Sequence, residues 1–450
     1  MSHKRHMSDY MFMLESHLSA DQNRVVAEVL DAAAEANTSL FLSGGAMRDM
    51  LGGFAIRDLD FTVEGNGIKV ARAVAKKTGA KVMAEDEARK SAELVFPGGA
   101  TAEIAMARSE RYSKPGAKPQ VTSATIHEDL GRRDFTVNAI ALSLNRASRG
   151  LLIDPTNGLG DLERKELRAA YNYALYDDPA RMLRLIRLKV RLGFSIEERT
   201  RSQSENVLAE HLETRIAPRR LFEELRNIAN DPTAPDIVRA LDEEKLLHVF
   251  SPAMVGPKLN LAGVVKLQKA KSLVPFGVRF PLEELGIFLY FLTEKLAPKE
   301  KTALVEATAM GKAEADLWQK LEVRTRKLER DLKSPKLSRP SQVYEVLSKA
   351  PGDQILFLLI RSPLRLVQDR VRNYLQKYLP MAQEVTDEEV LAKGVAPGTA
   401  KFQKVKGELI AAKLNARPKK VVPEEPVEPP QPVEPPPGQK RVLRQPIVRD

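Results

Sequence analysis

The sequence predicts an α+β N-terminal domain around a small mixed sheet, followed by an all-α remainder. Residues 1–150 alternate short apolar strands with amphipathic helices, whereas from about residue 161 onward most apolar patterns have helical spacing. Residues 415–450 carry ten of the chain's 29 prolines and little that a core can bury, which predicts disorder. The expected units are therefore residues 1–150, 151–250, 251–414 and 415–450.

The bulk composition limits the classes of function. The chain has 450 residues and no cysteine, which excludes a disulfide framework, a thiol nucleophile and a thiolate zinc site. Its formal net charge of +11 favours a polyanionic partner, nucleic acid before a membrane surface, although a merely solvated basic surface has the same composition. No apolar run approaches the roughly 20 residues of a membrane span. We expect a soluble cytoplasmic protein with no membrane partner; no oligomeric state is predicted.

The N-terminal elements follow in order. Residues 22–36 have the apolar spacing of a helix, and "SLFLSGG" predicts a buried strand that ends in a glycine turn. "AMRDMLGG" predicts a short helix, and "IRDLDFTV" alternates as a half-buried strand does. "AELVF" and "AEIAMA" are expected to pair as strands across "PGGAT". The next segment, "RSERYSKPGAKPQVTSAT", is polar and contains two prolines, which predicts a mobile loop.

Two acids, Asp58 and Asp60, lie on the second predicted strand. Residues two apart on a strand face the same side, so the two carboxylates point together while Leu59 and Phe61 face the core. Like charges this close are costly unless a cation lies between them. Mg²⁺ prefers oxygen ligands, and two such ions would activate an attacking hydroxyl and stabilise a leaving pyrophosphate. Glu103, on a later strand, is either a third ligand or a solvated edge residue.

A glycine turn precedes these acids. Ser43, Gly44 and Gly45 lie between a strand and a helix, where exposed backbone N–H groups suit a phosphate chain. Arg48, one turn into the helix, would reach the same phosphates. An ordinary strand–helix turn is the alternative reading of a bare "GG".

The segment "EDLGRRDFTVNAIAL" predicts a helix with one polar face. Arg132, Arg133 and Asp134 are expected where this helix begins, and Asn138 would lie one turn later on the same face. Such a cluster can hold a ribose and a triphosphate. Helix capping and a surface ion pair are the alternatives.

The clearest helix is "DDPARMLRLIRLKVRLGF", with a proline in its first turn and a glycine past its end. Asp178 and Arg181 place acceptors beside a planar donor fork, which can read the hydrogen-bonding edge of a base. A local ion pair between them is the alternative. Arg184, Arg187 and Arg191 extend a basic stripe along the helix, suited to a nucleic-acid backbone or to water.

In this order, the segments resemble the class II nucleotidyltransferases of the polymerase-β superfamily. These are the bacterial tRNA CCA-adding enzymes, the A-adding enzymes and the poly(A) polymerases. The resemblance covers about residues 38–230 and rests on "SGGAMRDMLGG…RDLDF", "EDLGRRDFTVNAIAL", "LIDPTNGLGDLERKELR", "DDPARMLRLIRLKVRLGF" and "RIAPRRLFEELRNI". It implies a polymerase-β-like catalytic head, then helical neck, body and tail segments, with base recognition in the neck.

The resemblance also implies a role for each candidate residue. Asp58, Asp60 and Glu103 would bind the catalytic Mg²⁺ ions, of which two are expected. The nucleotide-binding set would comprise Ser43, Gly44, Gly45, Arg48 and Asp49 at the triphosphate, Arg132, Arg133, Asp134 and Asn138 at ribose and phosphate, and Asp178, Arg181 and Arg184 near the base.

The activity implied by the resemblance is addition of CCA to the 3′ end of tRNA from CTP and ATP, without a nucleic-acid template. The tRNA 3′ hydroxyl would attack the α-phosphate with metal assistance and release pyrophosphate. Basic helices after about residue 255 would contact the tRNA backbone along the acceptor and T arms. Three alternatives stay open: an A-adding or C-adding specialist, a poly(A) polymerase, and a catalytically silent RNA-binding protein.

Three positions depart from the family pattern. Met47 replaces a valine beside the glycine turn, Asp177 replaces a glutamate beside the base-reading acid, and Asn157 replaces a glycine of the head–neck hinge. None of these changes removes a reacting group. The stretch "FTVEGNGIKVARAVAKK" lacks the basic segment expected of poly(A) polymerases, which favours the tRNA-directed branch.

Overall fold

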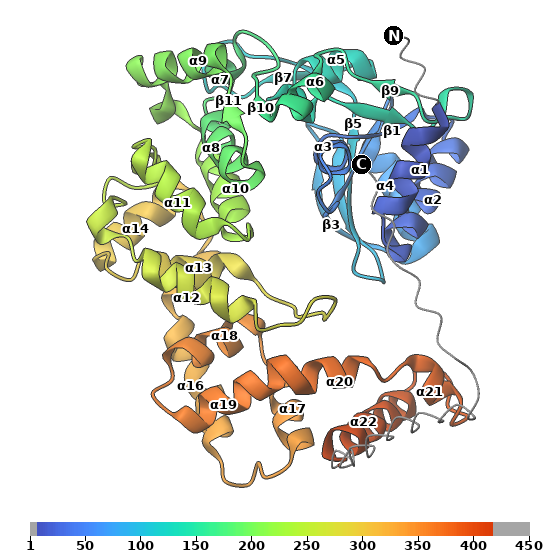
Figure 1. The fold of residues 1–450 in the computed structure, drawn as a ribbon, viewed down its shortest axis with the longest axis vertical. Coiled ribbons are helices and arrows are strands. Elements are labelled where there is room, and N and C mark those ends of the chain that lie inside the picture. Colours follow the sequence, from blue (N-terminus) through green and yellow to red (C-terminus); the bar gives the residue numbers. More distant parts are fainter. Residues whose placement is uncertain (1–6, 417–450) are drawn as a thin grey trace, which may run out of the picture.

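A computed structural model describes residues 7–416; residues 1–6 and 417–450 lie outside the described part. The head, which contains the sheet, lies at one end of the molecule, and helices lead away from it and then return beneath it (Figure 1). Apart from its first two residues, at the end of α22 (Ala400–Asn415), the proline-rich tail predicted for 415–450 falls outside the described residues.

The head is built on one mixed sheet of seven strands, as the sequence predicts. They are β1 (Leu40–Ser43), β2 (Leu59–Val63), β3 (Lys81–Asp86), β4 (Ser91–Val95), β5 (Thr101–Met106), β8 (Ala141–Ser143) and β9 (Leu152–Ile153). The strand order is β3-β4-β5-β2-β1-β8-β9, in which β2 and β5 run parallel and the other neighbours antiparallel. The predicted pairing of "AELVF" with "AEIAMA" is confirmed as β4 with β5.

The two faces of this sheet differ in chemistry. On one face Leu59 and Phe61 of β2 pack in the main core with Leu42 of β1. Asp60 and Thr62 alternate with them along β2 and therefore project from the opposite face. The predicted half-buried strand thus places its acid on the face that is not filled by the main core.

Helices α2 (Ala20–Glu35) and α4 (Gly67–Thr78) cover the apolar face. Val25 and Val29 of α2 are buried one turn apart, which is the spacing that predicts the helix. Gly79 ends α4 in the left-handed conformation that glycine adopts without steric cost. Two helices with one apolar side each therefore close this half of the core.

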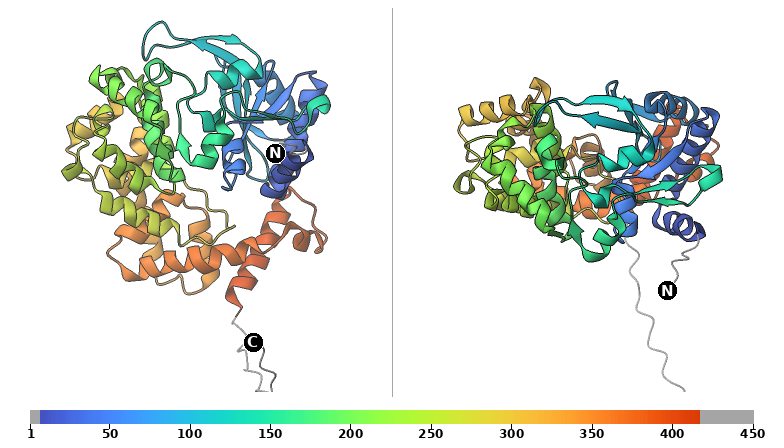
Figure 2. Two further views of the ribbon diagram at one scale, coloured as in Figure 1. Left: turned by 45° about the horizontal axis from the view of Figure 1, so that its top comes forward. Right: turned by 90° about the horizontal axis from the view of Figure 1, so that it is seen from above.

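The segment predicted as a mobile loop is instead a β-hairpin, so that prediction is wrong. Strands β6 (Arg108–Arg111) and β7 (Gln120–Ser123) pair antiparallel, and the hydroxyls of Ser109 and Thr122 lie 2.7 Å apart across them. Polar cross-strand pairs hide the apolar alternation by which a strand is usually predicted. In both views of Figure 2 the hairpin extends from the head toward the neck helices.

The helix predicted to begin at Arg132 is also wrong. A short helix, α5 (Ile126–Gly131), ends before that arginine, and residues Thr136–Asn138 form a single 3₁₀ turn. The following apolar residues join the sheet as β8, because β8 pairs with β1. A short buried apolar run satisfies helix and strand patterns equally, and the open edge of β1 decides between them.

Beyond the head, almost all regular structure among the described residues is helical, as predicted. The helices of the neck are α6 (Gly158–Arg164), α7 (Ala174–Asp177), α8 (Ala180–Leu192), α9 (Glu198–Ala209), α10 (Pro218–Ala229) and α11 (Ala234–Glu243). The later ones are α12 (Leu261–Lys271), α13 (Glu284–Leu292), α14 (Pro298–Ala307), α15 (Lys312–Gln319), α16 (Leu321–Lys333), α17 (Pro340–Ser348), α18 (Gly352–Arg361), α19 (Arg365–Asn373), α20 (Leu379–Gln383), α21 (Asp387–Leu391) and α22.

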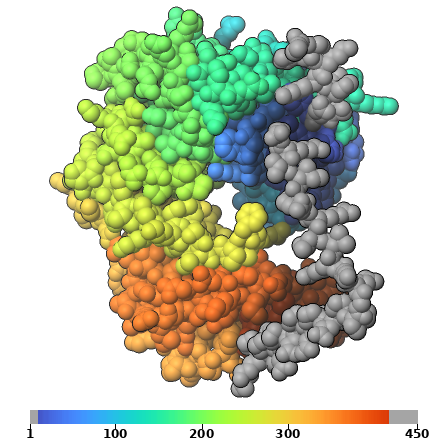
Figure 3. Space-filling view, in the orientation of Figure 1, coloured from blue at the N-terminus to red at the C-terminus, as the bar shows by residue number. Residues whose placement is uncertain are grey.

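One small exception interrupts the helical region. Strands β10 (Glu166–Leu167) and β11 (Ser195–Ile196) form a two-stranded parallel pair within the neck. Among residues 7–416, none of the helices combines the length and the apolar character needed to cross a membrane. In the space-filling view of Figure 3, a gap separates the head from the helices of the later segments.

Candidate active site

A cavity of about 930 Å³ lies where the open face of the head sheet meets the β6–β7 hairpin and helices α8 and α10. Most of the residues predicted for the site line it. They are Ser43, Gly44, Gly45, Arg48, Asp60, Glu103, Arg132, Arg133, Asp134, Asn138, Asp178, Arg181 and Arg184. Asp49 and Asp58 are the two predicted residues outside this lining.

The glycine turn lies against an acid and an arginine. A Cβ atom on Gly44 would lie 2.8 Å from Arg133 Nη1, and one on Gly45 would lie 3.1 Å from Asp60 Oδ2. Gly44 also has a φ of +67°, which favours glycine. The backbone N–H of Gly44 donates to the carbonyl of Ile140 (3.2 Å), and that of Gly45 donates to Asp60 Oδ2 (3.0 Å). Both N–H groups are therefore engaged within the protein, so the prediction that they are exposed to a phosphate chain is wrong.

The three predicted acids lie near one another on neighbouring strands. Asp60 of β2 is directly opposite Glu103 of β5 in the parallel register. Asp58 precedes β2, and its Oδ1 accepts a hydrogen bond of 2.5 Å from the hydroxyl of Thr101. Burial raises the pKa of Asp60 to about 7, and the charges of Glu103 and Asp58 contribute to the rise. The three carboxylates thus repel one another, as like charges at close range do.

Arg48 lies beside the glycine turn in a fixed orientation. Its Nη1 donates to Asn138 Oδ1 at 2.7 Å, while its Nε and Nη2 donate to Asp49 Oδ1 at 2.8 and 2.6 Å. Asn138 Nδ2 donates in turn to Asp134 Oδ1 at 3.0 Å. The predicted proximity of Asn138 and Asp134 is therefore observed, although no α-helix contains them. Asp49 lies behind Arg48 rather than in the cavity.

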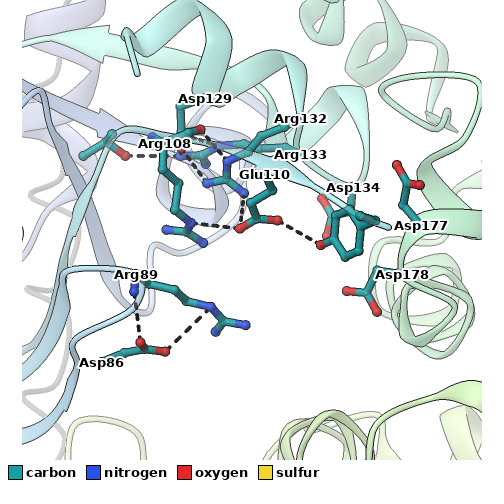
Figure 4. A network of polar contacts seen from close by, with 12 residues as sticks. Asp86, Arg89, Arg108, Glu110, Asp129, Arg132, Arg133, Asp134, Asp177 and Asp178 are labelled. Atoms are coloured by element: carbon teal, nitrogen blue, oxygen red, sulfur yellow. Dashed lines mark hydrogen bonds and ion pairs between the residues drawn. The ribbon is translucent and has the colours of Figure 1, made fainter. Parts of the chain in front are cut away.

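A cluster of charged residues fixes the base of the β6–β7 hairpin (Figure 4). Asp129 accepts from Arg132 Nη2 at 2.5 Å and from Arg133 Nη2 at 2.9 Å. Arg132 also donates to the carbonyl of Arg108 (2.8 Å) and to Glu110 Oε1 (3.1 Å). Burial raises the pKa of Glu110, but Arg132 and Arg108 outweigh it and lower this pKa to about 2. Arg132 is thus engaged mainly with the hairpin.

Asp178 and Arg181 lie at the neck side of the cavity without pairing to each other, so the alternative of a local ion pair is wrong. Arg220 Nη2 donates to Asp178 Oδ2 at 2.6 Å. Arg181 donates from Nη1 to the Tyr171 hydroxyl (3.1 Å) and from Nη2 to the carbonyl of Arg132 (3.0 Å). Each side chain is held by separate partners, which leaves the orientation of both groups defined before any base arrives.

The arginines predicted as a stripe along α8 bind carboxylates of the protein, so the alternative of a stripe that only meets water is wrong. Arg184 donates to Asp134 Oδ2 (2.8 Å) and to Glu224 Oε1 (3.0 Å), and Arg187 donates to Glu224 Oε2 (3.2 Å). Arg191 Nη2 donates to Asp49 Oδ2 at 2.9 Å. These arginines instead connect the neck to the head and to α10. Spacing alone could not place their acidic partners, which are distant in sequence.

Comparison with known proteins agrees with this geometry. Residues 40–168 match the family model of the poly(A) polymerase head domain. The fold of a CCA-adding enzyme in its apo form II superposes with a TM-score of 0.54 at 24% identity, covering 92% of this chain and 96% of that one. Residues 40–168 are therefore identified as a poly(A) polymerase head domain.

Two curated proteins are similar to this chain, one over most of its length and one at a higher identity over a shorter stretch. An A-adding tRNA nucleotidyltransferase of Geobacter sulfurreducens is 27% identical over 437 residues, which is 90% of this chain and 47% of that protein. A CC-adding tRNA nucleotidyltransferase of Deinococcus radiodurans is 36% identical over 221 residues, which is 49% of this chain and 58% of that protein. The chain thus spans about half the length of the curated relatives it matches.

The resemblance to class II nucleotidyltransferases implies catalytic metal ions. The carboxylates of Asp58, Asp60 and Glu103 are oxygen ligands of the kind that such ions bind. The donor set is three carboxylates on or beside the neighbouring strands β2 and β5. Burial raises the pKa of Asp60, and the charges of Glu103 and Asp58 raise it further. Among residues 7–416, no group of three or more acidic or histidine side chains is arranged so that it could hold a metal ion. The hydrogen bond from Thr101 holds the Asp58 carboxylate, which would have to turn to join the other two.

Several residues that shape this site were not found from the sequence. Asp129 could have been, because it lies three and four residues before Arg132 and Arg133, which is the spacing of neighbours on a helix. Arg220 and Glu224 lie 42 and 40 residues from their partners, Asp178 and Arg184, so no local spacing reveals them.

Proposed function

We propose that the chain transfers nucleotides from CTP and ATP to the 3′ end of tRNA without a nucleic-acid template. The observation that carries this proposal is the composition of the cavity. Asp60, Glu103 and Arg48 line its head side, and Asp178 and Arg181 line its neck side. Such an arrangement suits a nucleoside triphosphate whose phosphates face the acids and whose base faces the neck.

The side chains divide the work of the transfer between them. When bound, divalent ions would supply Lewis-acid stabilisation at the α-phosphate, and Asp58, Asp60 and Glu103 would hold them. Arg48 binds the triphosphate from beside the glycine turn, so that negative charge on the leaving pyrophosphate meets a fixed cation. Ser43 and Asp129 hold Arg133 next to the same turn, with Ser43 Oγ accepting at 2.9 Å.

Base selection in this proposal belongs to Asp178 and Arg181. A carboxylate accepts hydrogen bonds and a guanidinium donates them, so together they can match the edges of cytosine and adenine in turn. Arg220 and Tyr171 fix the two groups from behind. Replacing Arg181 by alanine should therefore impair discrimination between CTP and ATP more than the rate of transfer. The ratio of kcat/KM for the two nucleotides measures this effect, and an unchanged ratio would reject the assignment.

The number of nucleotides added defines two forms of the proposal. Addition of the full CCA by a single chain is the form predicted from the sequence. An A-adding specialist is the second, and it is favoured by the relative that aligns with 90% of this chain, which is named an A-adding enzyme. A CC-adding relative aligns with 49% of this chain at a higher identity of 36%.

Primer choice and nucleotide choice together test the proposal. Purified full-length protein is given tRNA that ends at the discriminator nucleotide, after one cytidine or after two, with CTP and ATP singly and together. Full CCA addition requires both nucleotides on the first primer, whereas an A-adding enzyme extends only the last. Extension of unstructured RNA in preference to tRNA would indicate a poly(A) polymerase. Tight tRNA binding with no metal-dependent incorporation would indicate a silent RNA-binding protein.

A further inference from the structure

A carboxylate behind the triphosphate site joins the head to the neck. Asp49 of α3 (Gly45–Leu51) is 3% exposed, and its Oδ2 accepts from Arg191 Nη2 of α8 at 2.9 Å. Its other oxygen, Oδ1, accepts from two nitrogens of Arg48. Asp49 therefore lies between two guanidinium groups, one that faces the cavity and one that comes from the neck.

This arrangement determines how Arg48 is presented. With Nε and Nη2 bonded to Asp49 and Nη1 bonded to Asn138, the guanidinium has one orientation. It lies next to the glycine turn, since a Cβ atom on Gly45 would be 3.6 Å from its Nη2. A cation that is ordered before its ligand arrives loses less conformational entropy on binding.

The charges also balance around Asp49. A buried carboxylate that had only Arg48 as partner would cancel the positive charge intended for the phosphates, and it would repel them directly. Arg191 supplies a second positive charge, so two guanidinium groups face one carboxylate and a net positive charge remains. Arg191 itself does not line the cavity, so any effect on a nucleotide passes through Asp49 and Arg48.

We propose that Arg191 is a positioning residue for triphosphate binding, which neutralises Asp49 and thereby keeps Arg48 oriented and free to bind phosphate. This inference rests on the proposed function, because it requires a nucleoside triphosphate in the cavity. It assigns a role at the phosphates to a residue of the neck, which otherwise serves base recognition.

Arg191→Gln tests the proposal by separating phosphate binding from base binding. We expect about tenfold weaker binding of CTP, since a charge-assisted contact is disturbed, with binding of CMP changed less than threefold. In turnover, the KM for CTP should rise by the same factor while kcat changes less than threefold. Lys189→Gln is the matched control, because Lys189 lies on the same helix and pairs with Glu244 at 3.5 Å. It should leave both affinities unchanged.

A second pair of variants keeps the test valid if the first is poorly folded. Arg191→Lys retains the charge and should bind CTP within threefold of wild type. The double variant Asp49→Asn with Arg191→Gln removes the charge of the carboxylate but keeps an oxygen for Arg48, so it should bind CTP more tightly than Arg191→Gln alone. A merely structural role of Arg191 predicts no such recovery. Equal losses for CTP and CMP, or no recovery in the double variant, would overturn the proposal.

Failure of the proposed function has a different signature. If the wild-type protein binds neither CTP nor ATP in calorimetry, the proposed function fails and this inference fails with it. If wild-type protein binds CTP and Arg191→Gln binds it equally well, only the role of Arg191 is rejected.

Discussion

At the scale of single residues, Asp60 is the side chain on which most other features of the site converge. It accepts a hydrogen bond from the glycine turn, lies opposite Glu103 and is close to the positive charges of Arg133 and Arg48. A bound cation would offset the repulsion between this carboxylate and its acidic neighbours. Its charge should therefore matter more to the reaction than its shape.

Replacing Asp60 by asparagine tests this view, because the amide keeps the size of the side chain. We expect nucleotide incorporation to fall at least about a hundredfold. Mutating a residue that only supports a metal ligand already costs up to about a hundredfold in activity, and Asp60 would be a ligand itself. Affinity for tRNA in filter binding should stay within about threefold of wild type. Glu87→Gln removes the same charge from an exposed position at the cavity rim and is the control. Near-normal turnover of the asparagine variant would reject the metal-binding role.

The carboxylate of Glu110 gives a prediction about pH. Its ordinary pKa of 4.5 is lowered to about 2 in the folded protein, because Arg132 and Arg108 outweigh the effect of burial. A lowered folded-state pKa stabilises the fold above pH 4.5, and that contribution disappears as the pH falls toward 2. Its upper limit is roughly 3 kcal/mol from the size of the shift.

Urea denaturation of Glu110→Gln at several pH values measures this contribution. The variant should be less stable than wild type at pH 7, and the difference should shrink as the pH falls below 4.5 toward 2. Glu345→Gln removes a solvent-exposed ion pair on α17 and should show little difference at any pH. A stability difference for Glu110→Gln that does not depend on pH would contradict the argument.

At the scale of elements, the β6–β7 hairpin closes the cavity by touching the neck at its tip. Gly116 donates its N–H to the carbonyl of Asp177 at 3.1 Å. Its φ is +72°, and a Cβ atom there would lie 2.5 Å from the carbonyl oxygen of Arg215. Only glycine allows this approach, because the neighbouring atom belongs to the backbone and cannot turn aside.

Gly116→Ala should therefore separate the hairpin tip from the neck. Hydrogen exchange of residues 112–119 should become faster, and CTP should bind several times more weakly, since one wall of the cavity is loosened. Gly79→Ala is the matched control, with a φ of +74° and no atom near its Cβ position. It carries the same backbone strain of about 1–2 kcal/mol without the collision. Equal effects of the two variants would indicate strain alone.

The elements differ in how well the sequence predicts them, and the reason is physical. β2 alternates apolar and polar residues because one face packs in the core, and that alternation is visible in "LDFTV". β6 and β7 pair polar side chains with each other, so no alternation marks them. The segment after Gly131 holds enough apolar residues for a helix, but pairing with β1 draws it into the sheet. Local patterns fail where a distant partner decides the structure.

At the scale of the whole molecule, the residues near the cavity also differ in how well the sequence predicts them. Asp58, Asp60, the glycine turn and Arg48 were predictable from their spacing within short segments. Glu103 lies on a later strand, and only the resemblance assigned it to the same group. The pairings of Arg220 with Asp178 and of Arg191 with Asp49 span 42 and 142 residues and depend on how the neck packs on the head. No spacing in the sequence shows that Arg191 of α8 and Arg220 of α10 turn inward.

The overall charge gives a prediction for RNA binding. With a net charge of +11, the chain should bind tRNA largely through phosphates, and such binding releases counterions. A protein that makes about six phosphate contacts loses on the order of a thousandfold in affinity between 50 and 200 mM salt. We expect a steep linear fall of log affinity with log salt in filter binding. Affinity that hardly responds to salt would contradict a backbone-directed mode of recognition.

The cavity takes one wall from the head, where the glycine turn and Arg48 lie, and another from the neck, where Asp178 and Arg181 lie. Residues that belong to only one wall can therefore change during evolution without altering the other wall. In the proposed function, a substitution at Asp178 would shift the preference between pyrimidine and purine while the head wall stays unchanged. Arg184 and Arg191 of α8 instead connect the two walls. Enzymes that add a different nucleotide could then evolve from one ancestor through substitutions in the neck wall alone.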